Sequence, residues 1–446
     1  MEVNEKLEAT SPHNLSLPAW EIMTEETDVV VVGAGGGGAV LALALAKQGI
    51  STVVLDHATG PPRGLRGEIL QPNGQRVLDR LGVLASLPAD ATRSVRLFHF
   101  CRAGGTRLCS IDYGDLPAPY NRAIVTLPNV AHHAIVAAVQ QHRSVTLRYG
   151  TSFAGLLREG DRVVGLSTQG PDGANTIRAK IVVGADGAFS KVREALKIPA
   201  DVYLYPDGYL IAILESEEPV SESFYYVGDR SILGIFPATG NKVYLFYMIP
   251  KDSMEAVKQR GIPALQQAWS LIAPQFAGLF RRLSDWSQTA YMPTGRVQTP
   301  TWVADGAVLI GDAAHAMNPH ASQGRMQAMV DAMALSDLLP GCLADKDYSA
   351  ARLREFERIR RPQVSMLQRL ADQQVFYWNT GNPVVAFLRD RVFQTLDRNA
   401  RLRYQVLSTT AGLRTMPPFS LVDRVIAAGF LPDLRAGERA PDPMSP

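Results

Sequence analysis

A chain of 446 residues is too long for one compact core, so we expect two joined domains and an additional segment. Its net charge of +2 gives no general electrostatic field for nucleic acid, which excludes a partner recognised by overall charge. The three cysteines have neither CxxC nor Cys/His spacing, so we expect no disulfide framework and no metal site. No apolar run reaches the ~18 residues that span a bilayer, and no secretory signal is evident, which predicts a cytoplasmic protein without a transmembrane segment.

The first predicted unit is a strand, a helix and a second strand near the N-terminus. Residues 1–26 are polar and aperiodic and are expected to form a disordered tail. The β-branched run Asp28–Gly33 predicts a buried parallel strand, Ala39–Lys47 predicts a buried helix, and Ser51–Asp56 predicts the second strand. This βαβ order indicates an α/β dinucleotide-binding domain.

Two later strands extend this domain. The apolar runs Ile181–Gly184 and Ala307–Ile310 are each followed by Gly and Asp residues, and they indicate a split fold with one parallel sheet. We therefore expect a discontinuous dinucleotide-binding domain that comprises residues 27–92, 118–198 and 288–345.

The intervening segments predict a different sheet. Val95–Cys101 and Arg107–Asp112 alternate like paired strands, and Tyr203–Pro250 contains several aromatic strands. We expect residues 93–117 and 199–287 to form an antiparallel-sheet substrate domain over the cofactor. Aromatic strand residues are more often core than ligand contacts, so the substrate-binding residues stay open. The candidates are Tyr226, Phe236 and Phe246.

The remaining residues, 346–446, have a helical pattern. Ser349–Arg361 predicts a solvated charged helix that Pro362 interrupts, and Val384–Leu396 has amphipathic spacing. We expect a C-terminal helical appendage that packs on the rest of the chain. A dimer contact or a peripheral membrane contact through these helices is the alternative.

A glycine-rich turn joins the first strand to its helix. Asp56 closes the second strand 23 residues beyond the first glycine of this turn. Glycines permit close approach of a pyrophosphate, the helix N-terminus offers N–H groups, and an acidic side chain suits ribose hydroxyls. The motif therefore predicts a dinucleotide site without choosing between NAD and FAD. Its glycines are Gly33, Gly35, Gly36, Gly37 and Gly38.

Two further motifs identify the cofactor. Residues 311–326 read GDAAHAMNPHASQGRM, with Asp331-Ala332 in the helix that follows, and residues 184–193 read GADGAFSKVR. Together with the glycine-rich turn, they resemble the motifs of FAD-dependent aromatic hydroxylases of the para-hydroxybenzoate hydroxylase type. The patterns of that family are GDAAHxxxPxxGQGxN and GADGxxSxVR, in the same order along the chain.

The resemblance implies FAD as the cofactor, NAD(P)H as a transient co-substrate, and oxygen transfer from a flavin C4a-hydroperoxide. It implies that Asp312 binds the ribityl chain of FAD. It also implies that the turn over residues 323–326 places backbone N–H groups and a helix N-terminus near the pyrimidine edge of the flavin. The cofactor-binding residues expected in this turn are Pro319, Gln323, Gly324, Arg325 and Met326.

Other positions have a second interpretation. Asp186-Gly187 resembles the element that serves FAD and the transient nicotinamide, although an aspartate that caps a helix would look the same. Arg66 matches an arginine that reaches the adenosine-pyrophosphate, with a solvated loop residue as the alternative. Asn129 stands where relatives carry Gln or Arg near the flavin, and an ordinary N-cap is the alternative.

The sequence also departs from the family pattern. Ser322 replaces a glycine and Met326 replaces a common asparagine, so we expect different hydrogen bonding in the loop over the flavin. His320 follows Pro319 and is the candidate for proton transfer, whereas His315 belongs to the motif and is expected to be structural.

These features predict an FAD-dependent monooxygenase whose partners are O2 and a small lipophilic, aromatic molecule such as a phenol, quinolone, quinone or polyketide. Hydroxylation and epoxidation both stay open. An FAD-dependent prenyl-chain reductase without oxygen chemistry is one alternative, and a non-catalytic flavin-binding protein is another. A flavin-dependent halogenase is disfavoured because no two tryptophans stand in the Trp-x-Trp spacing that such enzymes carry.

Overall fold

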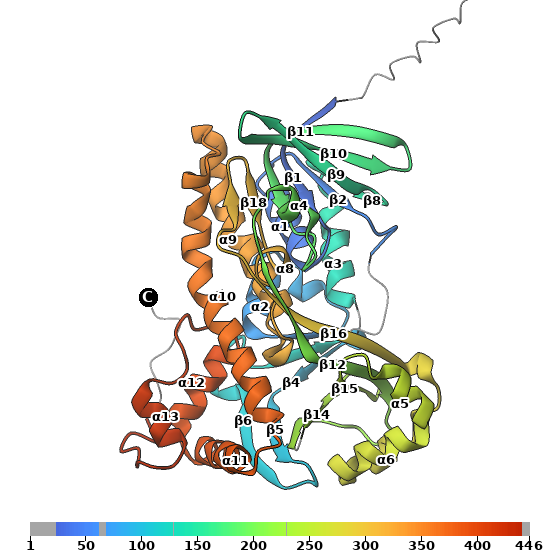
Figure 1. The fold of residues 1–446 in the computed structure, drawn as a ribbon, viewed down its shortest axis with the longest axis vertical. Coiled ribbons are helices and arrows are strands. Elements are labelled where there is room, and N and C mark those ends of the chain that lie inside the picture. The colour runs from blue at the N-terminus through green and yellow to red at the C-terminus, as the bar shows by residue number, and fades with distance from the viewer. Residues whose placement is uncertain (1–23, 62–67, 128, 229, 439–446) are drawn as a thin grey trace, which may run out of the picture.

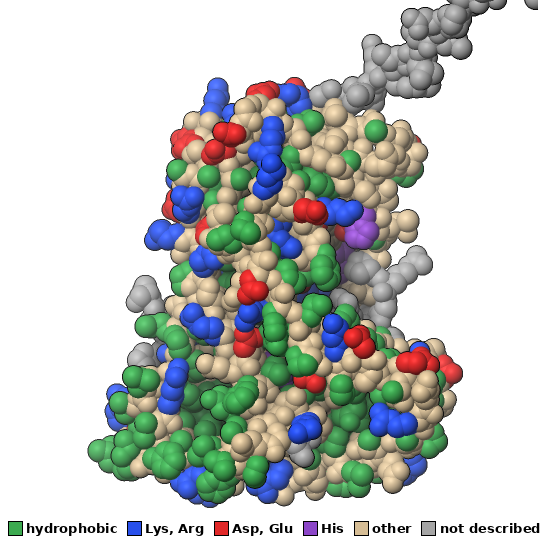
Figure 2. Space-filling view, in the orientation of Figure 1, with side chains coloured by type: hydrophobic (Ala, Val, Ile, Leu, Met, Phe, Trp, Pro, Cys, Tyr) green, Lys and Arg blue, Asp and Glu red, His purple; other side chains and the backbone are tan. Residues whose placement is uncertain are grey.

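The computed structural model describes residues 24–61, 68–127, 129–228 and 230–438, and it contains two large sheets and a helical end (Figure 1). Basic and acidic side chains are mixed over the face seen in Figure 2, in keeping with the small net charge. Most of the predicted disordered tail lies outside the described residues, and its last three residues already belong to the first strand. Among the described residues, no helix is long and apolar enough to cross a membrane.

The first sheet contains the buried parallel strands that the β-branched runs predict. Its strands β18, β11, β1, β2 and β8 run parallel, whereas β17, β10 and β9 pair antiparallel with their neighbours. The strand order begins with β17 (Val303–Ala304), β18 (Ala307–Leu309) and β11 (Gly173–Gly184), and it continues with β1 (Thr24–Val32), β2 (Thr52–Asp56) and β8 (Val145–Tyr149). The hairpin β9 (Ser152–Glu159) and β10 (Arg162–Gly170) extends from β11.

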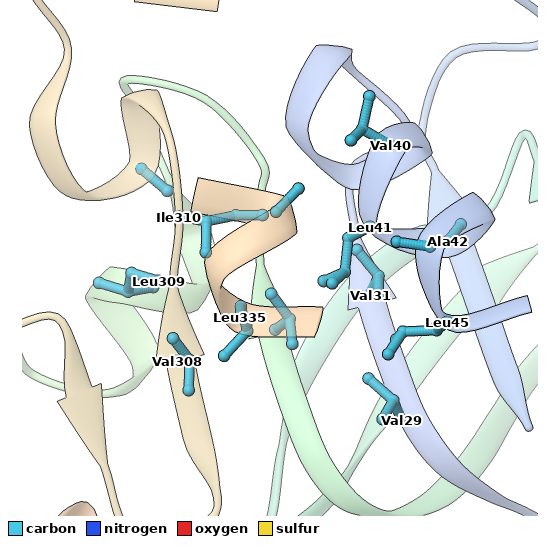
Figure 3. Packing of buried hydrophobic residues seen from close by; sticks show 14 of the residues in the cluster. Val29, Val31, Val40, Leu41, Ala42, Leu45, Val308, Leu309, Ile310 and Leu335 are labelled. Atoms are coloured by element: carbon cyan, nitrogen blue, oxygen red, sulfur yellow. The ribbon is translucent and has the colours of Figure 1, made fainter. Parts of the chain in front are cut away.

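Helices cover this sheet and complete its core. The helix α1 (Gly36–Ala46) is apolar all round and buried, because it lies between the sheet, α3 (Val130–Val139) and α9 (Gly324–Asp345). Figure 3 shows side chains of β1, α1, β18 and α9 in one core. Burial of each such side chain contributes roughly 1.5–3 kcal/mol relative to exposure. The labelled residues include Val29, Val31, Leu41, Leu45, Val308, Leu309 and Leu335.

The second sheet lies beside the first and has seven strands. Its order is β16 (Thr289–Gln298), β12 (Asp201–Glu215), β15 (Lys242–Pro250), β14 (Ser231–Pro237), β13 (Ser223–Gly228), β5 (Leu97–Arg102) and β6 (Arg107–Asp112). The helices α5 (Met254–Arg260), α6 (Ile262–Ile272) and α7 (Ala277–Phe280) pack near one face of this sheet. The α/β fold with a split dinucleotide domain and a second sheet is thus confirmed.

Three details of the strand pairing differ from the prediction. The second sheet is not wholly antiparallel, because β13 and β5 run parallel. Residues 288–298, expected in the dinucleotide domain, contain all of β16, which pairs with β12. Residues 93–95, expected in the substrate domain, belong to β4 (Thr92–Val95), which pairs with β7 (Ala123–Thr126) in a small sheet that also contains β3 (Glu68–Leu70). Strand pairing over such short segments depends on distant partners that local alternation does not reveal.

The C-terminal region is helical, as expected. It contains α10 (Ala350–Trp378), α11 (Pro383–Arg398), α12 (Ala400–Thr410) and α13 (Leu421–Ala427). The predicted break at Pro362 is wrong, because α10 continues through it. A proline inside a helix costs about 3 kcal/mol. Buried residues on both sides of it, Arg360 and Val364, hold the helix against the protein.

Candidate active site

The glycine-rich turn leads from β1 directly into α1. Gly33 has a φ of +102°, and a Cβ there would lie 2.3 Å from the Ala185 carbonyl oxygen, so this position needs glycine. A Cβ at Gly38 would lie 1.9 Å from the Gly33 carbonyl oxygen, which explains the last glycine of the motif. Gly35 is exposed at the N-cap of α1, no side chain caps this helix, and a Cβ at Gly35 would meet nothing within 4 Å. The start of α1 is therefore open to an anionic ligand.

The two middle glycines have a packing function. A Cβ at Gly36 would lie 2.9 Å from the Arg325 Cγ, and a Cβ at Gly37 would lie 3.2 Å from the Ala328 carbonyl oxygen. Both neighbours belong to α9, so these glycines let α1 approach α9 closely. This contact brings the glycine-rich turn next to the motif of residues 311–326.

Asp56 lies beside the turn, at the end of β2. Its Oδ2 accepts a hydrogen bond from the Ala34 N–H at 2.8 Å, and its Oδ1 accepts one from the Ala58 N–H at 2.9 Å. The half-buried carboxylate therefore holds the turn in place. Its position at the edge of the open site is also the one that a ribose-binding carboxylate needs.

The motif of residues 184–193 forms a helix cap. Asp186 accepts hydrogen bonds from the Ser190 hydroxyl at 2.5 Å and from the Val192 N–H at 3.1 Å, at the start of α4 (Lys191–Ala195). The capping alternative for Asp186 is therefore present in the structure. Gly187 has a φ of +84° and open space where a Cβ would stand, so it still fits close approach of a ligand.

Arg193 ends the same motif and links it to the next one. Its buried guanidinium donates hydrogen bonds to the carbonyl oxygens of Ala313 at 2.7 Å and Ala188 at 2.9 Å. Ala313 lies in α8 (Asp312–His315), so one arginine fixes both motif loops relative to each other. The family resemblance included this arginine but gave no reason for it.

A buried charge network anchors α8. The His315 Nε2 lies 2.6 Å from Oδ2 of Asp331, which also accepts a hydrogen bond from the Gly311 N–H at 3.0 Å. The other oxygen, Oδ1, accepts a hydrogen bond from Arg360 Nε at 2.8 Å. The charges of His315 and Arg360 outweigh burial and lower the pKa of Asp331 to about 2. His315 is thus placed as the structural residue that the sequence predicted.

A cavity of about 540 Å³ lies between the motif of residues 311–326 and the second sheet. The motif contributes Asp312, Pro319, His320, Gly324 and Arg325 to its wall. The sheet contributes mainly apolar and aromatic side chains, which include Ile211, Tyr225, Phe236, Tyr244 and Phe246.

Positive charge lies on the motif side of this cavity. The helix α9 begins at Gly324, no side chain caps it, and a Cβ at Gly324 would meet only Met317 and Asp312, at 3.7 and 4.0 Å. Burial lowers the pKa of Arg325 to about 10, which leaves its guanidinium charged at neutral pH. The exposed Asp312 carboxylate stands at the first position of α8. The N-terminus of α9 and the Arg325 guanidinium therefore supply positive potential beside the Asp312 carboxylate.

Two predicted cofactor residues direct their side chains into the protein. Gln323 accepts a hydrogen bond from the Asn73 side-chain amide at 2.9 Å and donates one to the Thr410 carbonyl oxygen at 2.7 Å. A Cβ at Gly74 would lie 2.1 Å from the Met326 sulfur, which shows that the Met326 side chain packs on α2 (Pro72–Arg80). These residues can serve a flavin only through their backbone or by shaping the loop, where Ser322 has a φ of +55°.

His320 forms a neutral pair with a tyrosine of the second sheet. Its Nε2 lies 2.6 Å from the Tyr209 hydroxyl, and the Trp378 ring stands edge-on to the imidazole at 5.4 Å. Burial of the imidazole disfavours its charged form and lowers the pKa of His320 to about 3. His320 is therefore neutral at pH 7.

The substrate candidates divide between the two faces of the sheet. Phe236 and Phe246 line the cavity, and Phe246 stacks on Tyr209 with ring centroids 3.8 Å apart. Tyr226 is wrong as a candidate, because its buried ring packs on the opposite face near Phe276. Its neighbour Tyr225 lines the cavity instead, since successive strand residues face opposite sides.

Two predicted cofactor residues, Arg66 and Asn129, lie away from these motifs in the sequence. Arg66 lies outside the described residues. Asn129 occupies the N-cap of α3 with a φ of +65° and makes no side-chain capping hydrogen bond, so the ordinary N-cap alternative is not what the structure shows.

Sequence reasoning missed Tyr209 and Trp378. Tyr209 shares a strand face with Ile211, which lines the cavity, so the alternation of β12 carries a signal for it. Trp378 ends α10 and reaches His320 only through the tertiary fold. No local pattern marks it.

The donor set fits FAD. An uncapped helix N-terminus stands beside Gly35 for a pyrophosphate, and Asp56 lies next to it for a ribose. A second uncapped helix N-terminus and Asp312 border the cavity for the flavin end. Within the described ranges, no group of three or more His, Cys, Asp or Glu side chains is arranged to hold a metal ion.

Comparisons with known proteins agree with this fit. Residues 26–371 match the FAD binding domain family. The chain is 29% identical to 6-methylpretetramide 4-monooxygenase of Streptomyces rimosus, over 87% of this chain and 93% of that protein. It is 26% identical to 3-demethoxyubiquinol 3-hydroxylase of Escherichia coli, over 87% and 99% of the two chains.

Solved structures share the fold at lower identity. The crystal structure of p-nitrophenol 4-monooxygenase PnpA of Pseudomonas putida superposes with a TM-score of 0.77 at 22% identity, over 88% of this chain and 99% of that one. That of PqsL of P. aeruginosa in complex with 2-aminobenzoylacetate gives 0.73 at 22% identity, over 81% and 99%. The predicted resemblance to flavoprotein aromatic hydroxylases is confirmed. Because the family match spans most of the chain, the protein belongs to the FAD binding domain family and is an FAD-dependent monooxygenase.

Proposed function

We propose that the protein inserts one oxygen atom from O2 into a small, lipophilic, aromatic substrate and consumes NAD(P)H. The observation that carries this proposal is that one cavity is lined by both the Asp312 to Arg325 region and the aromatic face of the second sheet. A substrate held against the sheet would meet the flavin at the motif side. When bound, FAD supplies the two-electron chemistry and the activation of oxygen.

The cavity favours a neutral ring system. Its volume of about 540 Å³ suits a small molecule, and its sheet side is apolar. Arg296 also lines it, but the guanidinium donates to Asp372 at 2.9 Å and to Asp201 at 3.2 Å, so its charge is already compensated. A phenol, quinolone, quinone or polyketide fits this wall. The names of two relatives, which act on 6-methylpretetramide and p-nitrophenol, support a ring substrate.

His320 lines the cavity and contacts Tyr209 of the second sheet. We assign the His320 and Tyr209 pair the binding of a substrate oxygen and the movement of its proton. A neutral imidazole donates one hydrogen bond and accepts another, so it can pass a proton along this pair without becoming charged.

The N-terminus of α9 and Arg325 give the cavity edge a positive potential. With FAD bound, this potential would favour negative charge at that edge of the cavity. NAD(P)H visits the flavin transiently in this proposal, because the sequence has one glycine fingerprint after a strand. We place the reaction in the cytoplasm.

Labelled oxygen tests the proposal. Turnover of ring phenols under ¹⁸O₂ should place one labelled atom in the product, with NAD(P)H consumed about one for one, as the single-oxygen stoichiometry requires. Product oxygen derived from water, or equal turnover without air, would overturn it.

Gly324→Val sharpens this test, because a larger side chain there has room within the protein but would stand toward the flavin. We expect normal folding with oxygen diverted to hydrogen peroxide. The control is Gly278→Val on α7, where a Cβ would meet only Arg281, at 3.8 Å. Equal peroxide release from both variants would remove Gly324 from the flavin site.

A further inference from the structure

Large apolar side chains stand exposed at one end of the molecule. Leu434 is 97% exposed, Leu421 is 79% exposed and Phe430 is 66% exposed. Figure 2 shows hydrophobic side chains gathered at the lower left, over the elements labelled α11, α12 and α13 in Figure 1. We call this set the C-terminal apolar surface. Its members are Phe387 on α11, Leu421, Val422 and Val425 on α13, and Phe430, Leu431 and Leu434 in the segment after α13.

The charges around this surface are unevenly arranged. Asp423 and Asp433 face inward, and each lies 2.8 Å from the Arg401 guanidinium. Within the part of the chain that the structure describes, four arginines there have no ion-pair partner. The exposed carboxylates of this stretch are Asp397, which accepts a hydrogen bond from the Ser110 N–H, and Glu438. The four arginines are Arg391, Arg398, Arg424 and Arg435.

A hollow within the surface holds one of these arginines between two exposed rings. It has a volume of about 450 Å³ and is lined by Phe387, Arg391, Arg398 and Leu431, among others. The Arg391 guanidinium lies 5.8 Å from the Phe387 ring centroid and 5.9 Å from that of Phe430. It also donates a hydrogen bond to the Gly429 carbonyl oxygen at 3.0 Å. The Arg391 guanidinium is therefore held between two exposed rings of the C-terminal apolar surface.

We propose that the C-terminal apolar surface docks the protein on a bilayer of anionic phospholipids. The apolar side chains enter the boundary between headgroups and acyl chains, and the arginines contact lipid phosphates. The charge arrangement selects this occupant over a second copy of the chain. A two-fold symmetric contact places the same patch on both sides, so arginines would face arginines while Asp423 and Asp433 stay turned inward.

Aromatic contacts connect α11, which carries Phe387 of this surface, to His320 in the cavity wall. The inner side of α11 packs Phe393 against Trp378, at 6.2 Å between ring centroids, and Trp378 contacts His320. A lipophilic substrate held in the bilayer would thus lie near the enzyme that uses it. This last step rests on the proposed function, whereas the docking itself does not.

Vesicle flotation of the FAD-loaded protein tests the docking. We expect binding to vesicles of phosphatidylglycerol and phosphatidylcholine, weaker binding to phosphatidylcholine alone, and weakening by salt. Leu421→Glu should lower the partition coefficient about tenfold, because it removes inserted apolar area and adds a negative charge. The matched control is Leu271→Glu on α6, where the leucine is 73% exposed but lies outside this surface.

Charge reversal tests the contribution of the arginines separately from that of the apolar side chains. Arg398→Glu should lower binding to the anionic vesicles at least fivefold. Arg358→Glu, at an exposed arginine of α10, should leave it unchanged. Circular dichroism and NAD(P)H oxidation in vesicle-free buffer should match the wild type for all four variants.

Three results would overturn the docking proposal. One is no binding to the anionic vesicles. Another is an equal loss of binding for Leu421→Glu and Leu271→Glu. The third is a dimer in sedimentation velocity that Leu421→Glu dissociates while vesicle binding is absent, which would assign the surface to a second copy. Failure of the ¹⁸O₂ experiment would leave these readouts unaffected.

Discussion

The two histidines of the segment from Gly311 to Met326 are held in opposite ways. His315 lies in a charged network with Asp331 and Arg360, whereas His320 contacts the neutral Tyr209 and the Trp378 ring. Both imidazoles are almost fully buried. The two buried imidazoles therefore differ in the groups that contact them.

This difference divides the segment into an anchor and a cavity wall. In the anchor, burial raises the pKa of Asp331, but its interactions with His315, Arg360 and the Gly311 N–H outweigh burial and lower that pKa to about 2. The cavity wall keeps His320 uncharged, which suits a lipophilic ligand. The anchor should thus govern stability, and the wall should govern substrate binding and pH dependence.

Removal of the anchor charge should have the largest effect. Asp331→Asn leaves the buried Arg360 without its carboxylate and should lower the free energy of unfolding by about 3–5 kcal/mol. Urea unfolding followed by circular dichroism measures this change. Asp337→Asn is the control, because that residue lies on the same helix in an exposed pair with Arg80 and should cost less than about 1 kcal/mol. Equal losses would show that the network is not the anchor.

Asp312 tests the flavin side of the same segment. Asp312→Ala should weaken FAD binding by about 1.5–3 kcal/mol, because a charged hydrogen-bond acceptor for the ribityl hydroxyls is lost. Fluorescence titration of the apoprotein with FAD measures the dissociation constant. Asp337→Asn again serves as the control and should bind FAD normally. An unchanged affinity in Asp312→Ala would place this carboxylate away from the cofactor.

The dinucleotide half of the site was readable in the sequence because its constraints are local. Gly38 is required by a contact with the Gly33 carbonyl oxygen within one βαβ unit, Gly33 takes a positive φ that favours glycine, and buried parallel strands read as β-branched runs. The partners of the anchor are not local. Arg360 belongs to a helix that the charge pattern predicted as solvated, yet it is buried against Asp331.

The substrate half was harder to read for a related reason. Aromatic residues occupy both faces of β13, so its sequence does not say which face meets the ligand, and Tyr226 was chosen where Tyr225 lines the cavity. His320 was found because it belongs to a motif. Its partner Tyr209 lies in β12 of the second sheet, about 110 residues earlier in the chain, and only the fold brings the two side chains together.

The cavity wall predicts a pH effect that begins at higher pH than the effect of Asp331 in the anchor, whose pKa is lowered from 3.8 to about 2. The pKa of His320 falls from 6.5 to about 3 on folding, so the unfolded chain binds one more proton between these values. Stability therefore decreases as the pH falls through this window, by about 1.4 kcal/mol per pH unit from this residue. His320→Gln should show a smaller decrease between pH 6 and 4 in urea unfolding. Parallel curves for the two proteins would contradict the neutral burial of His320.

The smallest effect should distinguish the two faces of the sheet. Phe246→Leu removes an aromatic wall of the cavity and its stacking on Tyr209, which is worth about 0.5–1.5 kcal/mol. We expect a twofold to roughly tenfold rise in KM for an accepted phenol, in line with that energy. The control Tyr226→Phe keeps the ring on the opposite face of the sheet and should leave KM unchanged. It removes only the hydroxyl that accepts a hydrogen bond from the Gln275 amide. Steady-state NAD(P)H oxidation with the phenol measures both values. If Tyr226→Phe raised KM as much as Phe246→Leu, the substrate would not lie on the cavity side of the sheet, and Phe246 would lose its assignment as a wall of the substrate site.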